Sequence, residues 1–121
     1  MVKGQFIDNT PIVKTTLVWG GLIQEPFLVL DSGFTGDVQI TPDIAEELAL
    51  KVTTVIPITV ANGQTVAFPM ATAVAILENS LTNVDVLISS DFNLAGIGLL
   101  SKLGYKMEID CKRRTVQMEL A

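Results

Sequence analysis

The stretch Phe27-Leu28-Val29-Leu30-Asp31-Ser32-Gly33-Phe34-Thr35-Gly36 decides the fold that this sequence predicts. Four apolar residues in a row are typical of a strand that is buried on both faces. A carboxylate, a hydroxyl and a glycine follow at once. Because burial disfavours an ionised carboxylate, Asp31 needs compensating hydrogen bonds. Ser32 can donate one, and Gly33 lets a backbone amide approach the carboxylate without a Cβ in the way.

The segments on either side of this stretch also predict strands. Residues 11–19 are rich in Ile, Val and Thr, which suit a pleated surface. Gly20-Gly21 is a two-residue hairpin signal, and residues 22–30 form the expected return strand. A short strand is expected at residues 38–40 after the glycine-containing loop.

The sequence predicts few helices. Thr41-Pro42-Asp43 predicts the start of a helix that ends near Leu50, because Thr suits the N-cap and Pro the first helical position. Residues 97–103 predict a second, shorter helix. Gly104 is expected to end it in the left-handed conformation.

The remaining segments predict an all-β (mainly β) fold. Residues 52–60 and 64–68 are expected to form a hairpin with Asn62-Gly63 as a type I′ turn. Further strands are expected at residues 71–77, 84–88, 105–110 and 115–120. We therefore expect one domain over residues 1–121, a closed barrel or folded sheet with one or two short helices.

Composition excludes several kinds of chemistry. The chain has no histidine and a single cysteine, Cys111. It therefore lacks a Ser-His-Asp triad, imidazole metal ligands, an internal disulfide and a thiolate zinc site. Carboxylates, hydroxyls, lysines and backbone amides must carry any reaction, and no metal or cofactor is expected.

Charge and hydropathy bear on partners. Eight basic and 13 acidic residues give a net charge of −5, which argues against nucleic acid. The one basic cluster, Lys112-Arg113-Arg114, is typical of a solvated turn, with Cys111 an ordinary turn cysteine rather than an activated thiol. No apolar run reaches the roughly 18 residues of a membrane span, so we expect no membrane association and a cytoplasmic location. The apolar fraction of 49% suggests an oligomer.

The 30–36 segment resembles the active site of a known family. Apolar-apolar-Asp-Ser/Thr-Gly is the signature of aspartic proteases, and Leu30-Asp31-Ser32-Gly33-Phe34-Thr35-Gly36 is similar to the small retropepsin-like members of bacteria and archaea. Further features that resemble this family are the 60–66 segment, where it has a hairpin flap, the apolar-apolar-Gly element Leu94-Ala95-Gly96 before a helix, and the 105–110 strand. The resemblance covers about residues 13 to 120.

The resemblance implies an aspartic endopeptidase with peptide or protein substrates. It assigns Asp31 as the catalytic acid and base. The other implied site residues are the catalytic-loop residues Ser32, Gly33, Thr35 and Gly36, the flap residues Ala61, Asn62, Gly63 and Gln64, and the loop-bracing residues Leu94, Ala95 and Gly96. Ser32 departs from the commoner Thr but keeps the hydroxyl. Retroviral members hold substrate backbone with a polar residue near the place of Thr35 and Gly36, so those contacts do not transfer.

One motif implies two chains. Aspartic proteolysis uses two carboxylates that share a proton across a water molecule, and this sequence has only one Asp-Ser/Thr-Gly. The second Asp31 must then come from another copy, so we expect a symmetric homodimer with the site on its two-fold axis. By resemblance, the terminal strands belong to that interface.

Other interpretations of the motif remain open. The same fold could serve as a non-cleaving peptide-binding or dimerisation module, or Asp31 could simply cap a turn. Ser32 is a poor nucleophile because no histidine exists and no lysine is near it in sequence. A carboxylate-pair glycosidase is more distant, since nothing in the sequence nominates its second carboxylate.

Overall fold

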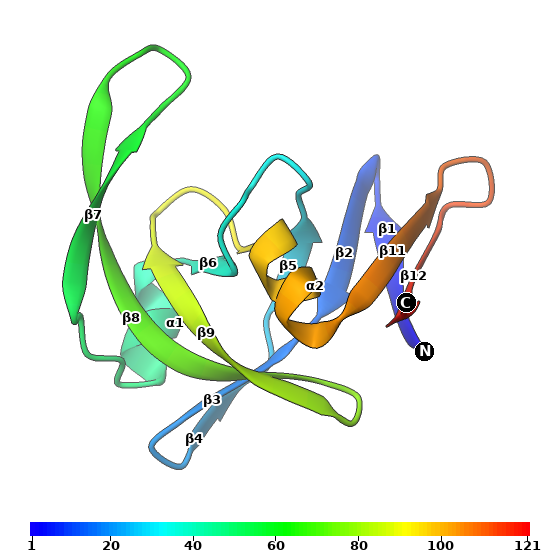
Figure 1. Cartoon of the computed structure of the whole chain (residues 1–121), viewed down its shortest axis with the longest axis horizontal. Coiled ribbons are helices and arrows are strands. Elements are labelled where there is room, and N and C mark those ends of the chain that lie inside the picture. Colours follow the sequence, from blue (N-terminus) through cyan, green and yellow to red (C-terminus); the bar gives the residue numbers. More distant parts are fainter.

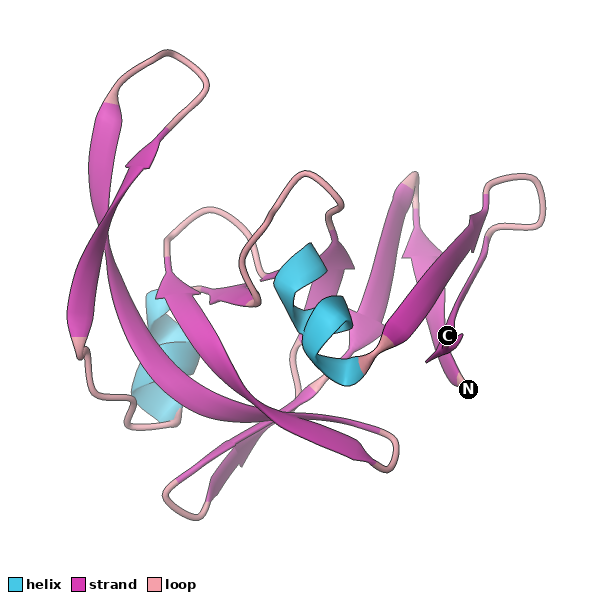
Figure 2. Ribbon diagram, viewed as in Figure 1, coloured by secondary structure: helices cyan, strands magenta, loops and turns pink.

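The computed structural model describes all 121 residues and has twelve strands and two short helices, so the mainly β class is confirmed (Figure 2). Neither helix is long and apolar enough to cross a membrane. The helices are α1 (Pro42–Glu47) and α2 (Ile97–Leu103). The strands are β1 (Val2–Ile7), β2 (Thr10–Lys14), β3 (Thr16–Trp19), β4 (Leu22–Gln24), β5 (Phe27–Leu30), β6 (Val38–Ile40), β7 (Thr54–Thr59), β8 (Thr65–Leu77), β9 (Ser80–Ile88), β10 (Leu94–Ala95), β11 (Tyr105–Asp110) and β12 (Thr115–Leu120).

All the strands belong to one folded sheet that does not close. Its order is β11-β12-β1-β2-β5-β10-β6-β9-β8-β3-β4, and β7 pairs only with β8. A barrel requires the first and last strands of this order to pair, whereas β11 and β4 lie at different ends of the molecule (Figure 1). The closed barrel is therefore wrong, and the folded sheet is the arrangement observed.

The two long strands predicted before the Asp31 motif are each divided. The 11–19 segment breaks at Thr15, and the 22–30 segment breaks before Phe27. Pro26 causes the break, because it has no N–H to give to a ladder. Its carbonyl instead accepts the Thr15 amide at 3.0 Å. As a result β2 pairs with β5 while β3 pairs with β4. The hairpin turn between β3 and β4 is confirmed, since Gly20 and Gly21 both have positive φ, 55° and 84°.

Strand β8 joins two segments that were predicted as separate strands. Pro69, which divided them in the pattern, lies inside β8 and opposite Val55 of β7. The next residue, Met70, is the last residue of β8 to pair with β7 and the first to pair with β9. Strand β9 begins at Ser80, four residues before its predicted start. Strand β1 was not predicted, although its residues alternate between inward and exposed positions.

The helices follow their predicted starts but α1 is shorter. Thr41 takes the N-cap position of α1, yet its side chain makes no capping hydrogen bond. Helix α1 ends at Glu47 rather than near Leu50, because Ala49 turns to a φ of 50° and the Leu50 amide donates back to the carbonyl of Ala45 at 3.0 Å. Helix α2 ends as predicted, with Gly104 left-handed at a φ of 69°.

The core fixes the strands that carry the Asp31 motif. Leu28 of β5, Val38 of β6 and Val86 of β9 are completely buried. Leu48 and Leu99, from the two helical segments, belong to the same cluster. Each such side chain contributes about 1.5–3 kcal/mol when fully buried. The ends of β5 and β6 are thus held firmly, and the segment between them begins and ends at fixed points.

Candidate active site

The loop of residues 31–37 connects two strands that are not neighbours. Strand β10 lies between β5 and β6, parallel to the first and antiparallel to the second. The 31–37 loop therefore has to span two strand spacings, roughly 9–10 Å, instead of forming a tight hairpin. It arches above the sheet beside α2 in Figure 1.

Residues 95–98 hold this loop in place by backbone hydrogen bonds. The Asp31 amide donates to the Ala95 carbonyl at 3.0 Å, and the Gly96 amide donates to the Asp37 carbonyl at 2.9 Å. In between, the amides of Ile97 and Gly98 donate to the carbonyls of Phe34 and Gly36 at 2.9 and 3.0 Å. The structure thus brings Ala95 and Gly96 against the 31–37 loop, with Leu94 paired to β5 and β6, and the family resemblance implies a bracing element at these three residues.

Gly96 is required for this close approach. A Cβ at this position would lie 2.6 Å from the Phe34 carbonyl oxygen and would contact the Gly36 carbonyl oxygen more closely still. Real Cβ atoms are not found at such distances from backbone. Any larger residue would push the loop off β10.

Asp31 is half-buried at the start of the loop. Its Oδ1 accepts a hydrogen bond from the Gly33 amide at 2.9 Å, which is the contact expected for a glycine at that position. Ser32 and Thr35 are exposed, and Gly36 is half-buried. The sequence suggested that the Ser32 hydroxyl could donate to Asp31, but within the chain the Gly33 amide is the donor that bonds this carboxylate.

The hairpin of β7 and β8 stands out from the body of the molecule (Figure 1). Its tip, Ala61, Asn62, Gly63 and Gln64, is exposed. The type I′ turn predicted at Asn62-Gly63 is wrong, because only Gly63 has a positive φ, at 85°. Its amide donates to the Val60 carbonyl at 2.9 Å, so the tip is a three-residue loop with Gly63 in the left-handed position. Asn62 Oδ1 accepts the Gln64 amide at 3.0 Å.

A cavity of about 380 Å³ lies between this hairpin and the 31–37 loop. Cavities of roughly 300–1,000 Å³ are typical of ligand sites. Asp31 does not line it, so the cavity lies beside the motif rather than over it. The lining residues are Phe34, Thr35, Gly36, Asp37, Val38, Ile56, Ile58, Met70, Asp85 and Leu87.

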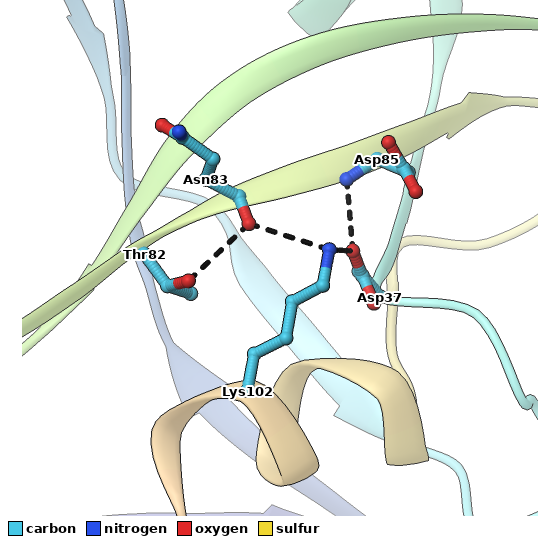
Figure 3. Close-up of polar contacts among 5 residues, drawn as sticks. All are labelled: Asp37, Thr82, Asn83, Asp85 and Lys102. Carbon is cyan, nitrogen blue, oxygen red and sulfur yellow. Dashed lines mark hydrogen bonds and ion pairs between the residues drawn. The ribbon is translucent and has the colours of Figure 1, made fainter.

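Asp37, at the end of the loop, is a residue that the sequence did not nominate. Its side chain is 7% exposed, and its Oδ2 lies 2.5 Å from Lys102 Nζ of α2. The Asp85 amide of β9 donates to the same oxygen at 2.9 Å, and Lys102 also reaches the Asn83 carbonyl at 3.4 Å (Figure 3). The hydrogen bond to Asp37 raises the pKa of Lys102 above its ordinary value. No local pattern could have revealed this contact.

The basic cluster closes the turn between β11 and β12. The amides of Lys112 and Arg113 donate to Asp110 Oδ1 at 3.0 and 2.9 Å. These bonds and the Arg113 side chain hold the pKa of Asp110 below its ordinary value. Arg114 lies 5.1 Å from the centre of the Phe6 ring, and Cys111 is an exposed free thiol.

No family model matches this chain, and no curated protein matches it in sequence. The site must therefore be interpreted from its own geometry. No three His, Cys, Asp or Glu side chains come together as a metal centre would require. The candidate site therefore consists of the half-buried Asp31, the Gly33 amide that bonds its carboxylate, and the adjoining cavity.

Proposed function

We propose that the protein is a retropepsin-like aspartic endopeptidase that works as a homodimer. One observation carries the proposal: the Asp31 carboxylate accepts the Gly33 amide in a loop that the Leu94-Ala95-Gly96 segment braces by backbone hydrogen bonds. A carboxylate held in this way has a fixed position and remains half accessible. Such a position suits a group that must hold a water molecule against a substrate.

In the proposed reaction two Asp31 side chains, one from each copy, share a proton across a water molecule. Two carboxylates this close cannot both ionise, so one is protonated and the other is a base. The base takes a proton from the water, and the water oxygen adds to the scissile carbonyl carbon, whose oxygen takes the proton of the acid. The C–N bond of the resulting gem-diol then breaks: the leaving nitrogen takes the proton from the Asp31 that served as base, and a diol hydroxyl returns its proton to the other Asp31, which restores the shared proton. No covalent enzyme intermediate forms.

Exposure around the motif supports a second copy. Ser32 and Gly33 are both exposed in the single chain. Phe92 is 66% exposed in the segment that leads to β10. Its carbonyl accepts Gln39 Nε2 at 3.0 Å, which ties that segment to β6. Leu81 and Leu120 are also large apolar side chains that the single chain leaves exposed, and a second copy would cover part of this apolar surface.

The hairpin of β7 and β8 has the place of a flap in this proposal. Strand β7 pairs only with β8, so its outer edge is free. The tip residues Ala61, Asn62, Gly63 and Gln64 would close over an extended peptide, which would bind in a β-like manner. The cavity beneath the hairpin would then receive a substrate side chain.

Mixing intact chains with Asp31→Asn chains tests the shared site. After equal amounts have exchanged subunits, a site built from both copies leaves about a quarter of the dimers with two carboxylates. Activity per intact chain then falls by about half relative to an unmixed sample. Activity that follows only the amount of intact chain would contradict the shared site.

Cleavage itself is tested with a peptide library and a statine inhibitor, which imitates the tetrahedral state. The expected result is cleavage that both the inhibitor and Asp31→Asn abolish. A confirmed dimer that cleaves nothing from acid to neutral pH would instead support the non-cleaving peptide-binding module.

A further inference from the structure

The cavity beside the Asp31 loop carries an unbalanced negative charge. Among its lining residues only Asp37 and Asp85 are charged. Lys102 is the one cation bonded there, and its ammonium group bonds Asp37. Lys102 also feels the charge of Asp85, but Asp85 forms no ion pair. Two carboxylates and one ammonium leave one negative charge at the cavity wall.

Asp37 and Asp85 differ in their availability to a ligand. Asp37 is buried, and its Oδ2 already accepts both Lys102 and the Asp85 amide. Its Oδ1 lies against Gly98, where even a Cβ would not fit. Asp85 is exposed, and the hydrogen bond from its own amide fixes its place on β9. Figure 3 shows the Asp85 amide directed at the Asp37 carboxylate, so the two aspartates lie next to each other. Asp85 is therefore the carboxylate that can accept a ligand.

The other walls of the cavity are apolar. Ile56 and Ile58 come from β7, Met70 from β8 and Leu87 from β9. These side chains suit an aliphatic stem that ends at Asp85. Lysine and arginine have such a stem with a cation at its end.

We propose that this cavity is a subsite for a lysine or arginine side chain of the substrate, and that Asp85 accepts its cation. The inference rests on the proposed peptidase function, since it names a substrate preference of that site. In the same arrangement Asp37 is a positioning residue, because it holds Asp85 and the Asp31 loop together.

Three peptides that differ at one position test the subsite. The position carries lysine, norleucine or glutamate, and a separate peptide series places it at each residue on either side of the scissile bond. At one position we expect kcat/KM for lysine to exceed that for norleucine about threefold to fivefold, as an ion pair with an exposed carboxylate gives. Asp85→Asn should remove this preference, so that the lysine and norleucine peptides are cleaved with similar kcat/KM.

Asp91→Asn is the matched control. Asp91 is an exposed aspartate outside the cavity, so its loss changes net charge equally but should keep the lysine preference. A charge reversal, Asp85→Lys, should favour the glutamate peptide. An unchanged lysine preference in Asp85→Asn, or equal losses in Asp85→Asn and Asp91→Asn, would overturn the subsite.

Binding to Asp31→Asn chains separates this inference from the peptidase function. Labelled peptides are titrated into these chains, in which cleavage is not required. If the intact protein cleaves nothing but the Asp31→Asn chain binds the lysine peptide about threefold to fivefold more tightly than the norleucine peptide, the function fails and the subsite stands. Equal affinity for the two peptides, or no binding of either, overturns the subsite.

Discussion

Lys102 Nζ lies 2.5 Å from Oδ2 of Asp37, although the two residues are 65 positions apart in the chain. The pair joins α2 to the end of the 31–37 loop, and the Asp85 amide adds β9 to the same point. The Asp37 side chain is only 7% exposed, whereas that of Lys102 is 40% exposed. A carboxylate removed from water in this way depends on its partners.

Lys102→Met should therefore destabilise the fold. It keeps the aliphatic stem but leaves the Asp37 carboxylate with fewer partners. Because Lys102 is partly exposed, we expect a loss of about 1–2 kcal/mol, below that of a fully buried pair. Urea unfolding measures it. Lys106→Met is the control, since the Lys106–Glu119 pair is exposed on both sides and should contribute less than about 0.5 kcal/mol. Equal losses in the two variants would contradict a special role for Asp37.

The same pair predicts how stability depends on pH at the alkaline end. Asp37 raises the pKa of Lys102 above the ordinary 10.5, so the folded state holds this proton more tightly than the unfolded state. The stability that the protonated Lys102 contributes to the fold is then fully present below the ordinary pKa of lysine and is lost as pH rises through the raised pKa of Lys102. The difference in unfolding free energy between wild type and Lys102→Met should stay constant up to about pH 10 and shrink above it. A difference that shrinks below about pH 9 would contradict this assignment.

Local sequence patterns predicted much of the fold, and most of the wrong predictions concern which strands pair with each other. The second helix and Gly104 were predictable because their determinants lie within a few residues of each other. The break at Pro26 is an exception, since a proline inside a strand is itself a local signal, and the predicted 22–30 strand ran through it. The opening of the sheet, in contrast, depends on how β4 and β11 lie in space. No window of sequence contains that information. The turn at Gly63 differs from a type I′ turn by one residue, which the dipeptide alone does not distinguish.

In the candidate site, too, contacts between sequence neighbours were predictable and contacts between distant strands were not. Asp31 and Gly33 are neighbours in sequence, so a short motif could indicate their hydrogen bond. The contact of Leu94-Ala95-Gly96 with the loop was predictable only through the resemblance to a family. The ion pair of Asp37 and the charge of Asp85 at the cavity wall have no local pattern at all, because they arise where distant strands meet.

Gly96→Ala should displace the Asp31 loop. The added Cβ meets backbone oxygens of Phe34 and Gly36, which cannot move without breaking the brace. We expect a loss of about 2 kcal/mol or more, as for overpacking of a tight site. Amide hydrogen exchange at Asp31, whose N–H bonds Ala95, should become faster. Gly20→Ala is the control, since a Cβ there meets nothing within 4 Å. It should lose about 1 kcal/mol through its positive φ and leave the Asp31 amide protected.

Thr15→Val should leave stability unchanged or raise it. The Thr15 hydroxyl is completely buried and has no hydrogen-bond partner. Valine has the same shape without the unpaired oxygen, and the Thr15 amide keeps its bond to Pro26. We expect a gain of about 0.5–1 kcal/mol in urea unfolding. Thr115→Val, at an exposed position, should change stability by less than about 0.5 kcal/mol. A loss of more than about 1 kcal/mol in Thr15→Val would show that the hydroxyl has a favourable role.

Gly63→Ala and Gly21→Ala form a matched pair that tests the flap. The two glycines have nearly equal φ, 85° and 84°, and an added Cβ meets nothing within 4 Å at either position. Both variants should therefore lose a similar amount of stability, about 1 kcal/mol, through left-handed strain alone. Only Gly63 lies at the tip of the hairpin beside the cavity, so only Gly63→Ala should lower kcat/KM for peptide cleavage, by about threefold to tenfold. Equal activity in the two variants at equal stability would mean that the hairpin tip takes no part in substrate binding.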